Sequence, residues 1–356
     1  MMQINQTHKP RIFHGPEKIC GIGRYLADWQ RENKAVRSDF IVYSDHTPYQ
    51  NSHQNLHLDK KNTIQAFFSK IDFLRKAIND YDLFHFYFGK TLLPLNLDLP
   101  ILKLFHKNII MHYVGSDIRI MRIARKENPF LIHRPPKGFL DRNDFLKMVR
   151  MVWQSIWFDR CLAGKEIYVY AKSAIPKRKI VNSIMVSNTI DFSTTQPDFS
   201  THPIPVIVHA PTHTGTKGTD YVERAMGELK SDGYIFDFQL IHNKPHDEVI
   251  DTIKNKADIV VDQLLIGGFG SLAMEGMSYG KTVCGYVRDS LRAELPDLPI
   301  VQCTINTIKE KLAWLIDHPK ERIRLGKAGW EFAKVHYDRN KNCEELWELY
   351  TELLNP

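Results

Sequence analysis

The chain has 356 residues, of which 43% are hydrophobic and 25% charged, and its formal net charge is +7. These fractions are typical of a folded globular protein and exclude disordered, collagen-like and coiled-coil chains. The five cysteines are scattered without C-x-x-C spacing, which argues against a disulfide framework and against a zinc site. The polar N-terminus predicts no signal peptide, and no apolar run approaches the roughly 20 residues of a membrane span, so we expect a cytoplasmic protein.

Apolar runs of strand length alternate with helical periodicity through the first half of the chain. Residues 11–15 predict a strand, and a glycine turn leads from it into a helix over 21–32. The same patterns predict further strands at 39–44, 83–88, 108–114, 166–171 and 183–187, and further helices at 63–79, 99–105 and 143–162.

The alternation is more regular in the second half. It predicts strands at 205–210, 236–242, 258–263 and 282–287, and helices at 219–229, 245–255, 271–280, 306–317, 321–336 and 340–354. Strands that alternate with helices of this length indicate parallel sheets with right-handed crossovers. We therefore predict two doubly wound α/β domains over 1–195 and 204–335, a turn-rich linker between them, and a C-terminal helix over 338–356. In such sheets ligands bind beyond the carboxyl ends of the strands, so we expect the site in a cleft between the domains.

The segment DQLLIGGFGSLAMEGMSYGKTV (262–283) carries the strongest local motif. A strand ends at Asp262, and a glycine-bearing loop opens a helix that contains Glu275. Glycines allow a phosphate to approach the backbone, and the N–H groups of Gly270, Ser271 and Leu272 would bind an anion at the helix start. Glu275, one turn further along, would accept hydrogen bonds from ribose hydroxyls. A plain loop-to-helix turn with a surface glutamate is the alternative.

A second loop, in PVIVHAPTHTGTKGTDY (205–221), supports the same interpretation. Lys217 and Gly218 open a helix after a strand and a polar turn. A lysine at this position is a point charge suited to a diphosphate, whereas an ordinary surface lysine is the alternative.

The segments KGTDYVERAM, ADIVVDQ and FGSLAMEGMSYGKTV, in this order and spacing, resemble the C-terminal half of GT-B-fold retaining glycosyltransferases of family 4 (group 1). The match covers about 205–290, and the helical tail resembles the family's return helix to the first domain. The N-terminal half matches loosely, through CGIGRYLADWQRE, FHFYFGKTLLPL and MHYVGSDIR. The resemblance implies a GT-B fold, in which two Rossmann-like domains face a central cleft.

The resemblance also implies roles for individual residues. Lys217 would neutralise the departing diphosphate, Glu275 would hold the ribose, and His112 and Asp117 would flank the strand end that faces the transferred sugar. The remaining implied donor-binding residues are Gly21, Gly23, Thr214, Thr216, Asn243, Lys244, Gly270, Ser271 and Leu272.

The implied activity is that of a retaining, metal-independent hexosyltransferase. It would move a sugar from a nucleotide-diphosphate donor to a polysaccharide, glycolipid or glycoprotein acceptor, with no cofactor. Positioning and positive charge would supply the catalysis, since the leaving diphosphate can itself deprotonate the acceptor. A hydrolase with paired carboxylates has no motif in this sequence.

Two departures from the family pattern leave an alternative open. Gly267 stands where the pattern has its first acidic residue, and the loop before Lys217 lacks the family's arginine; a protonated His213 could substitute for it. A non-catalytic glycosyltransferase-like subunit, binding carbohydrate or a partner glycosyltransferase, is therefore the alternative function. A nucleotide-sugar epimerase would share the fold but not the Lys-Gly and glutamate motifs.

Charge and amphipathicity suggest one more partner. Residues 1–200 carry 30 Lys and Arg against 18 Asp and Glu, whereas residues 201–356 carry 18 against 23. A basic half predicts an anionic partner, with a solvated lysine-rich surface as the alternative. No nucleic-acid recognition motif is present, so we expect no nucleic acid. The helix over 143–162 has an apolar stripe, which is most often a core face. Together with the basic excess it suggests, as a hypothesis, peripheral contact with the inner face of an anionic membrane.

Overall fold

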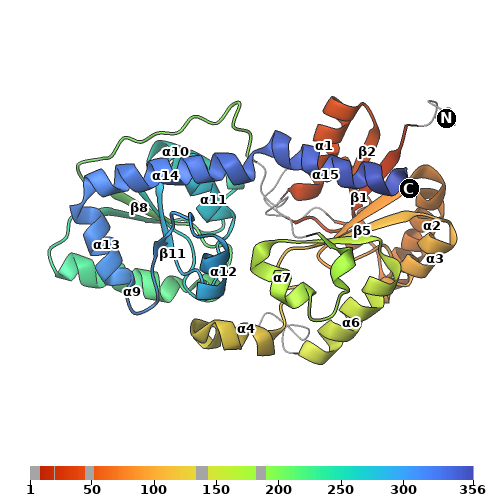
Figure 1. Ribbon diagram of the computed structural model, residues 1–356, viewed down its shortest axis with the longest axis horizontal. Helices are drawn as coiled ribbons and strands as arrows, with labels where there is room; N and C mark the ends of the chain where they lie inside the picture. Colours follow the sequence, from red (N-terminus) through yellow and green to blue (C-terminus); the bar gives the residue numbers. More distant parts are fainter. Residues whose placement is uncertain (1–8, 20, 45–51, 134–142, 182–189, 356) are drawn as a thin grey trace. The chain divides into compact units, whose positions relative to one another are not determined.

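The computed structural model describes residues 9–19, 21–44, 52–133, 143–181 and 190–355. The chain forms two compact units, each with its own parallel sheet (Figure 1). The first unit consists of Met1–Ile120, Phe139–Thr189 and Asn340–Pro356, and the second consists of Met121–Gly138 and Ile190–Arg339. The described residues 121–133 lie inside the domain predicted over 1–195, but they belong to the second unit.

The first unit contains a seven-stranded parallel sheet of order β3-β2-β1-β4-β5-β6-β7. Its central strands are almost fully buried, as expected for a parallel sheet covered on both faces. The register pairs His14 with His85 and Tyr87 with His112. The strands are β1 (Arg11–Gly15), β2 (Arg37–Val42), β3 (Gln54–Asn55), β4 (Leu83–Tyr87), β5 (Asn108–Tyr113), β6 (Arg160–Ala163) and β7 (Ile180–Val181).

One face of this sheet is covered by α1 (Ile22–Lys34) and by the last helix of the chain, α15 (Arg339–Leu354). Leu26 of α1 and Leu346 of α15 are buried in the same core cluster. Arg160 at the start of β6 pairs with Glu352 at 2.6 Å. The C-terminal helix is thus an integral part of the unit that the N-terminal strands build, and Figure 1 draws it on the opposite side of the sheet from α6.

The right-handed crossovers place α2 (Thr63–Asp80), α3 (Asp98–Leu104) and α6 (Asp144–Trp157) on the other face. Local sequence starts these helices well. Asn62 and Gln65 form a reciprocal capping box on α2, and Asn143 Oδ1 accepts the Leu146 N–H at 3.0 Å on α6.

The interpretation of the apolar stripe on the helix over 143–162 as a core face is wrong. The apolar residues of this stripe, and a similar set on α2, are largely exposed to solvent. The exposed residues are Ile64, Phe67, Phe68 and Ile71 on α2, and Phe145, Val149, Val152 and Ile156 on α6. Within the described ranges, no helix combines the length and apolar character needed to cross a membrane.

The second unit contains a five-stranded parallel sheet of order β12-β11-β10-β8-β9. Ile207, Val222, Leu229 and Ile259 are fully buried in its core, between the sheet and its helices. The strands are β8 (Val206–His209), β9 (Asp237–Leu240), β10 (Ile259–Val261), β11 (Thr282–Gly285) and β12 (Val301–Gln302). The helices are α4 (Met121–Glu127), η3 (Pro129–His133), α8 (Thr214–Lys217), α9 (Thr219–Ser231), α10 (His246–Asn255), α11 (Ser271–Ser278), α12 (Asp289–Glu294), α13 (Ile308–Asp317) and α14 (Pro319–Tyr337). Two parallel sheets with helical crossovers confirm the predicted α/β class.

Two predicted elements of the first unit need correction. The helix predicted over 143–162 ends at Trp157, and the buried strand β6 begins at Arg160. The strand predicted over 166–171 is instead the helix α7 (Lys165–Ala171), which begins after Gly164 and buries Ile167, Tyr170 and Ala171 at helical spacing. The strand predicted over 183–187 lies outside the described residues.

Candidate functional site

The loop after β8 places Lys217 at the carboxyl edge of the second sheet. The short helix α8 ends at Lys217, and Gly218 then begins α9 with a φ of +80°. A Cβ at residue 218 would lie 3.1 Å from Leu265 Cγ. The left-handed backbone and the close contact both favour glycine here. The Lys-Gly pair therefore has a local structural reason as well as a chemical one.

His209, at the end of β8, fixes this loop. Its Nδ1 lies 2.8 Å from the Val261 carbonyl oxygen, and its Nε2 lies 2.9 Å from Thr219 Oγ1. Burial lowers the pKa of His209 to about 4, so the ring is neutral near pH 7. A neutral ring can donate from Nδ1 to the carbonyl and accept at Nε2, which joins β10 to the start of α9.

Two buried side chains, Asp262 and Gln263, hold the Lys217 ammonium. Lys217 Nζ donates to Gln263 Oε1 at 2.8 Å and lies 3.5 Å from Asp262 Oδ1. Asp262 Oδ2 accepts the backbone N–H of Gly270 at 2.6 Å, and Gln263 Nε2 donates to the Gly268 carbonyl at 2.6 Å. Neither residue was predicted from the sequence as a partner of the lysine. They tie the cation and the glycine loop into one network.

Gly270 lets the ammonium approach the start of α11. A Cβ there would lie 2.9 Å from Lys217 Nζ and 3.3 Å from Asp262 Oδ1. The N–H groups of Ser271 and Leu272 follow in the first turn, where intrahelical acceptors do not exist. The lysine charge and the positive end of the helix together favour an anion. Because the Gly270 N–H already binds Asp262, the amides of Ser271 and Leu272 are the ones suited to that anion.

Glu275, on the second turn of α11, is fixed by His246. Its Oε1 lies 2.7 Å from the Nε2 of His246, the first residue of α10. Burial lowers the pKa of His246, but the hydrogen bond and the charge of Glu275 outweigh it and raise the pKa overall. Asn243 and Lys244 lie just before α10, so the structure brings the glutamate close to the loop that carries these two predicted donor-binding residues. His246 follows that loop in sequence, which is the one signal that could have identified it.

Gly267 lacks an acidic side chain for a structural reason. Its φ is +71°, and a Cβ there would lie 2.8 Å from Asn128 Nδ2. Asn128 is buried and donates to the Leu265 carbonyl at 2.9 Å. Neither the backbone nor the space at position 267 therefore suits a glutamate.

The segment that carries Asn128 is held against this part of the second unit by further contacts. Glu127 Oε2 accepts from Arg288 Nε at 3.2 Å and from Ser290 Oγ at 3.0 Å. The Phe130 ring meets the Tyr286 ring edge-on, with centroids 4.8 Å apart. These neighbours of the glycine loop could not be inferred from local motifs, since they come from a segment far away in sequence.

In the first unit, Gly21 and Gly23 meet packing requirements. Gly21 caps α1 with a φ of +72°, and a Cβ at residue 23 would lie 2.5 Å from the Phe40 ring. The glycine turn thus allows α1 to approach β2. This accounts for both glycines without a ligand, and their donor-binding role stays a prediction.

His112 and Asp117, at and after the end of β5, are both buried. Asp117 Oδ1 accepts the Gly115 N–H at 2.7 Å; burial raises the pKa of Asp117, and this N–H opposes the rise. The His112 ring stacks on His85 with centroids 5.5 Å apart, and burial lowers its pKa to about 3. Within the first unit both side chains serve the local structure, and their roles toward a sugar stay predictions.

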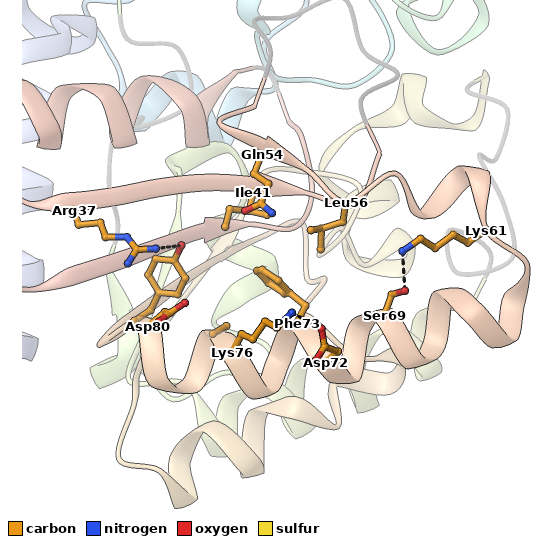
Figure 2. Close-up of a pocket in the computed structure, with 12 residues that line it drawn as sticks. Arg37, Ile41, Gln54, Leu56, Lys61, Ser69, Asp72, Phe73, Lys76 and Asp80 are labelled. Atoms are coloured by element: carbon orange, nitrogen blue, oxygen red, sulfur yellow. Dashed lines mark hydrogen bonds and ion pairs between the residues drawn. The ribbon is translucent and has the colours of Figure 1, made fainter.

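The first unit also contains a pocket of about 320 Å³ between α2 and the β2–β3 edge of its sheet (Figure 2). Phe73 and Leu56 form an apolar part of the pocket. Two of its cations have partners: Arg37 Nη2 donates to Tyr81 Oη at 3.4 Å, and Lys61 Nζ donates to Ser69 Oγ at 2.8 Å. None of the predicted site residues lines this pocket.

Comparisons by sequence find no matching family model and no matching curated protein. Solved structures match over nearly the whole chain. Sucrose-phosphate synthase from Thermosynechococcus elongatus has a TM-score of 0.67 and 12% identity, covering 97% of this chain and 99% of that chain. A glycosyltransferase from Rickettsia africae has a TM-score of 0.66 and 12% identity, covering 98% and 99%. HepE from Anabaena, in complex with UDP-glucose, has a TM-score of 0.63 and 11% identity, covering 97% and 100%.

These similarities show that the chain has the GT-B fold that the sequence predicts. A protein from Listeria monocytogenes described as a UDP-N-acetylglucosamine 2-epimerase also matches, with a TM-score of 0.56 and 12% identity over 96% of this chain and 95% of that chain. The fold therefore does not by itself distinguish sugar transfer from epimerisation.

Proposed function

We propose that this protein is a glycosyltransferase whose donor is a nucleotide-diphosphate sugar. The observation that carries the proposal is the arrangement on the second unit, where the Lys217 ammonium lies at the start of α11 and Glu275 lies one turn further along the helix. The cation and the helix amides would bind the diphosphate, and the glutamate would accept hydrogen bonds from the ribose. The sugar nucleotide bound by HepE, which shares the fold, supports this class of donor.

The proposed reaction is hexosyl transfer with retention of configuration. The bond between the anomeric carbon and the diphosphate oxygen breaks, and the acceptor oxygen bonds to the same face of the sugar. The acceptor proton passes to the leaving diphosphate, whose new charge is stabilised by Lys217 and the helix start. Since the protein supplies this positive charge, the proposed reaction needs no metal. The acceptor would be a polysaccharide, glycolipid or glycoprotein.

A thermal-shift panel of UDP, GDP, dTDP, ADP and CMP tests the donor site. A ligand at 100 times its Kd adds about 2.7 kcal/mol to the free energy of unfolding, which raises the melting temperature measurably. We expect one nucleotide to stabilise the wild type, and Lys217→Ala and Glu275→Ala each to abolish the shift. Lys254→Ala, which removes an exposed lysine from α10, is the matched control and should keep the full shift.

Activity then separates the two candidate functions. Slow hydrolysis of the matching nucleotide sugar, unaffected by EDTA, together with an acceptor product of unchanged anomeric configuration by NMR, would support the enzyme. If no nucleotide binds at millimolar concentration, the proposal fails and a carbohydrate- or partner-binding subunit takes its place. The motivation for that alternative is Gly267, where Asn128 and the left-handed backbone leave no room for the missing acid.

A further inference from the structure

Helix α6 turns its apolar side to solvent. Phe145 is 73% exposed, Val149 49%, Val152 47% and Ile156 59%. Their spacing of four, three and four residues places them on one side of the helix. In a helix that packs on a sheet, such a stripe normally faces the sheet.

The opposite side of α6 packs on the rest of the first unit through the buried Met151 and through two polar side chains that are hydrogen-bonded there. Lys147 is 1% exposed, and its Nζ donates to the Arg119 carbonyl at 2.7 Å. Gln154 is fully buried; its Nε2 donates to the Gly89 carbonyl at 2.8 Å, and its Oε1 accepts from the Tyr113 hydroxyl at 2.7 Å. Rotating the helix to bury the apolar stripe would expose or strand these groups. The buried hydrogen bonds of Lys147 and Gln154 therefore keep the apolar side of α6 facing solvent.

The stripe continues onto neighbouring elements on the same face of the sheet. Lys103 Nζ lies 2.8 Å from Asp159 Oδ1, which joins the end of α3 to the residues directly after α6. We define the outer apolar face as the exposed apolar residues of α6 and of the end of α3: Leu104, Phe105, Phe145, Val149, Val152 and Ile156. Exposed apolar side chains gathered in this way mark an interaction site.

Basic residues flank the outer apolar face. Lys177 and Arg178 are exposed. They lie beside the end of α6, since the next residue, Lys179, donates to the carbonyl oxygens of Ser155 and Phe158 at 2.7 and 2.8 Å. The acidic residues beside this face add little negative charge to it, since Asp159 pairs with Lys103 at 2.8 Å and Asp98 of α3 is buried. Asp144 stands at the start of α6. The face thus combines apolar side chains with a basic margin.

We propose that the outer apolar face docks on the surface of an anionic phospholipid bilayer. Apolar side chains of an interfacial helix enter the boundary between headgroups and acyl chains, and nearby Lys and Arg attract anionic lipids. A second copy of this chain is a poorer occupant, because it would bring the same excess of basic charge to the contact, whereas an anionic lipid surface would neutralise it. The proposal goes beyond sugar transfer and does not depend on nucleotide binding.

Vesicle flotation of the full chain tests this. The vesicles are phosphatidylcholine alone and a 7:3 mixture of phosphatidylcholine with phosphatidylglycerol, each at low and high salt. We expect the wild type to float with the anionic vesicles at low salt, with about tenfold less binding to phosphatidylcholine or at high salt. V149Q/I156Q keeps the net charge but removes apolar surface, and K177E/R178E reverses the basic margin. Each should lower binding at least tenfold.

Ile235→Gln is the matched control, since this residue is 70% exposed but lies in the second unit; it should bind as the wild type does. Circular dichroism and the nucleotide thermal shift should be unchanged in all variants. Flotation is measured without nucleotide, so its result is independent of whether the donor site binds one. The proposal is overturned if the wild type does not float with anionic vesicles, or if V149Q/I156Q floats equally well. A dimer in light scattering that V149Q/I156Q dissociates, without vesicle binding, would identify a second copy as the occupant instead.

Discussion

Glycine at position 270 sets how near the Lys217 ammonium comes to the start of α11. Gly270→Ala keeps an ordinary backbone, since φ is −109°, but its Cβ would lie 2.9 Å from Lys217 Nζ. We expect the ammonium to move away from the anion site, and nucleotide affinity to fall about tenfold, equivalent to about 1.4 kcal/mol. Isothermal titration calorimetry measures the change.

A second glycine provides the control for this prediction. In Gly227→Ala, on α9, the added Cβ meets nothing within 4 Å. We expect this variant to keep the wild-type affinity and to gain about 0.5–1 kcal/mol in the free energy of unfolding. Equal affinities for Gly270→Ala and the wild type would contradict the prediction that this glycine sets the position of the lysine for the diphosphate.

Restoring the acidic residue of the family pattern should damage the protein. Gly267→Glu combines a left-handed φ with a contact of 2.8 Å to Asn128 Nδ2. We expect a loss of about 2 kcal/mol or more in the free energy of unfolding, measured in urea, and no gain in donor affinity. A stable variant with tighter donor binding would contradict this prediction. It would mean that the Asn128 side chain can move aside and that position 267 can accommodate the acidic residue of the family pattern.

At this scale the sequence identifies residues that act within one motif, and it misses partners from other segments. Lys217, Gly270 and Glu275 stand out because a glycine turn and a helix start are local patterns. Asp262 and His246 were not assigned their roles, because those roles depend on which loops converge at the carboxyl edge of the sheet. No periodicity encodes that convergence.

At the scale of elements, β1, β4 and β5 bring three histidines together under α1 and α15. His14 lies 2.7 Å from the Tyr87 hydroxyl, and His85 Nδ1 is hydrogen-bonded to the Tyr350 hydroxyl of α15. Burial lowers the pKa of His14 to about 4 and that of His112 to about 3, and it lowers the pKa of His85 well below its ordinary value. The three sheet positions are therefore occupied by neutral imidazoles.

This row should make the fold sensitive to acid. The pKa values are lower in the folded state than the ordinary value near 6.5, so the unfolded chain binds more protons below that pH. The free energy of unfolding is therefore highest above about pH 6.5 and falls as the pH is lowered toward 4. At pH 5, His14 alone should lower the free energy of unfolding by on the order of 2 kcal/mol. Urea unfolding at pH 7.5 and 5.0 measures the difference.

Two variants test the assignment of this acid sensitivity. His112→Phe retains an aromatic ring and removes a group whose Nδ1 has no partner among the described residues, so it should reduce the dependence on pH. His242→Gln changes an exposed histidine and should leave the dependence as it is. A urea midpoint that is equal at both pH values in the wild type would contradict the prediction.

Elements were predictable where a single periodicity held, and were wrong where two competed. Residues 166–171 alternate enough to suggest a strand, yet Ile167, Tyr170 and Ala171 are buried at helical spacing after Gly164. The stripe of α6 could be identified from the sequence, but the sequence left open whether it faces the core or solvent. Direction depends on Lys147 and Gln154 finding buried partners, which is a property of the folded first unit.

At the scale of the whole molecule, the last helix stabilises the unit that the first strands build. Leu346 of α15 is 4% exposed and packs in the core cluster with Ile22 and Leu26 of α1. We expect Leu346→Ala to lose about 2–4 kcal/mol in the free energy of unfolding, measured by denaturant titration. Glu345→Ala, at an exposed neighbouring position, should stay within about 0.5 kcal/mol of the wild type. Alanine has the highest helix propensity, so a loss of propensity cannot mimic the effect of lost burial. A Leu346→Ala variant as stable as the wild type would contradict the prediction.

The assignment of residues 121–133 to the second unit limits how this fold can be recombined. A chimera that joins the first 190 residues of another GT-B protein to the remainder of this chain would exchange Glu127 and Asn128, but keep their partners Arg288 and Leu265. The glycine loop would then contact residues of the other protein in place of Glu127 and Asn128, although its own sequence is unchanged. A crossover that respects the physical units must therefore transplant the internal segment together with the C-terminal half, so the boundary for exchanging parts is not a single point along the chain.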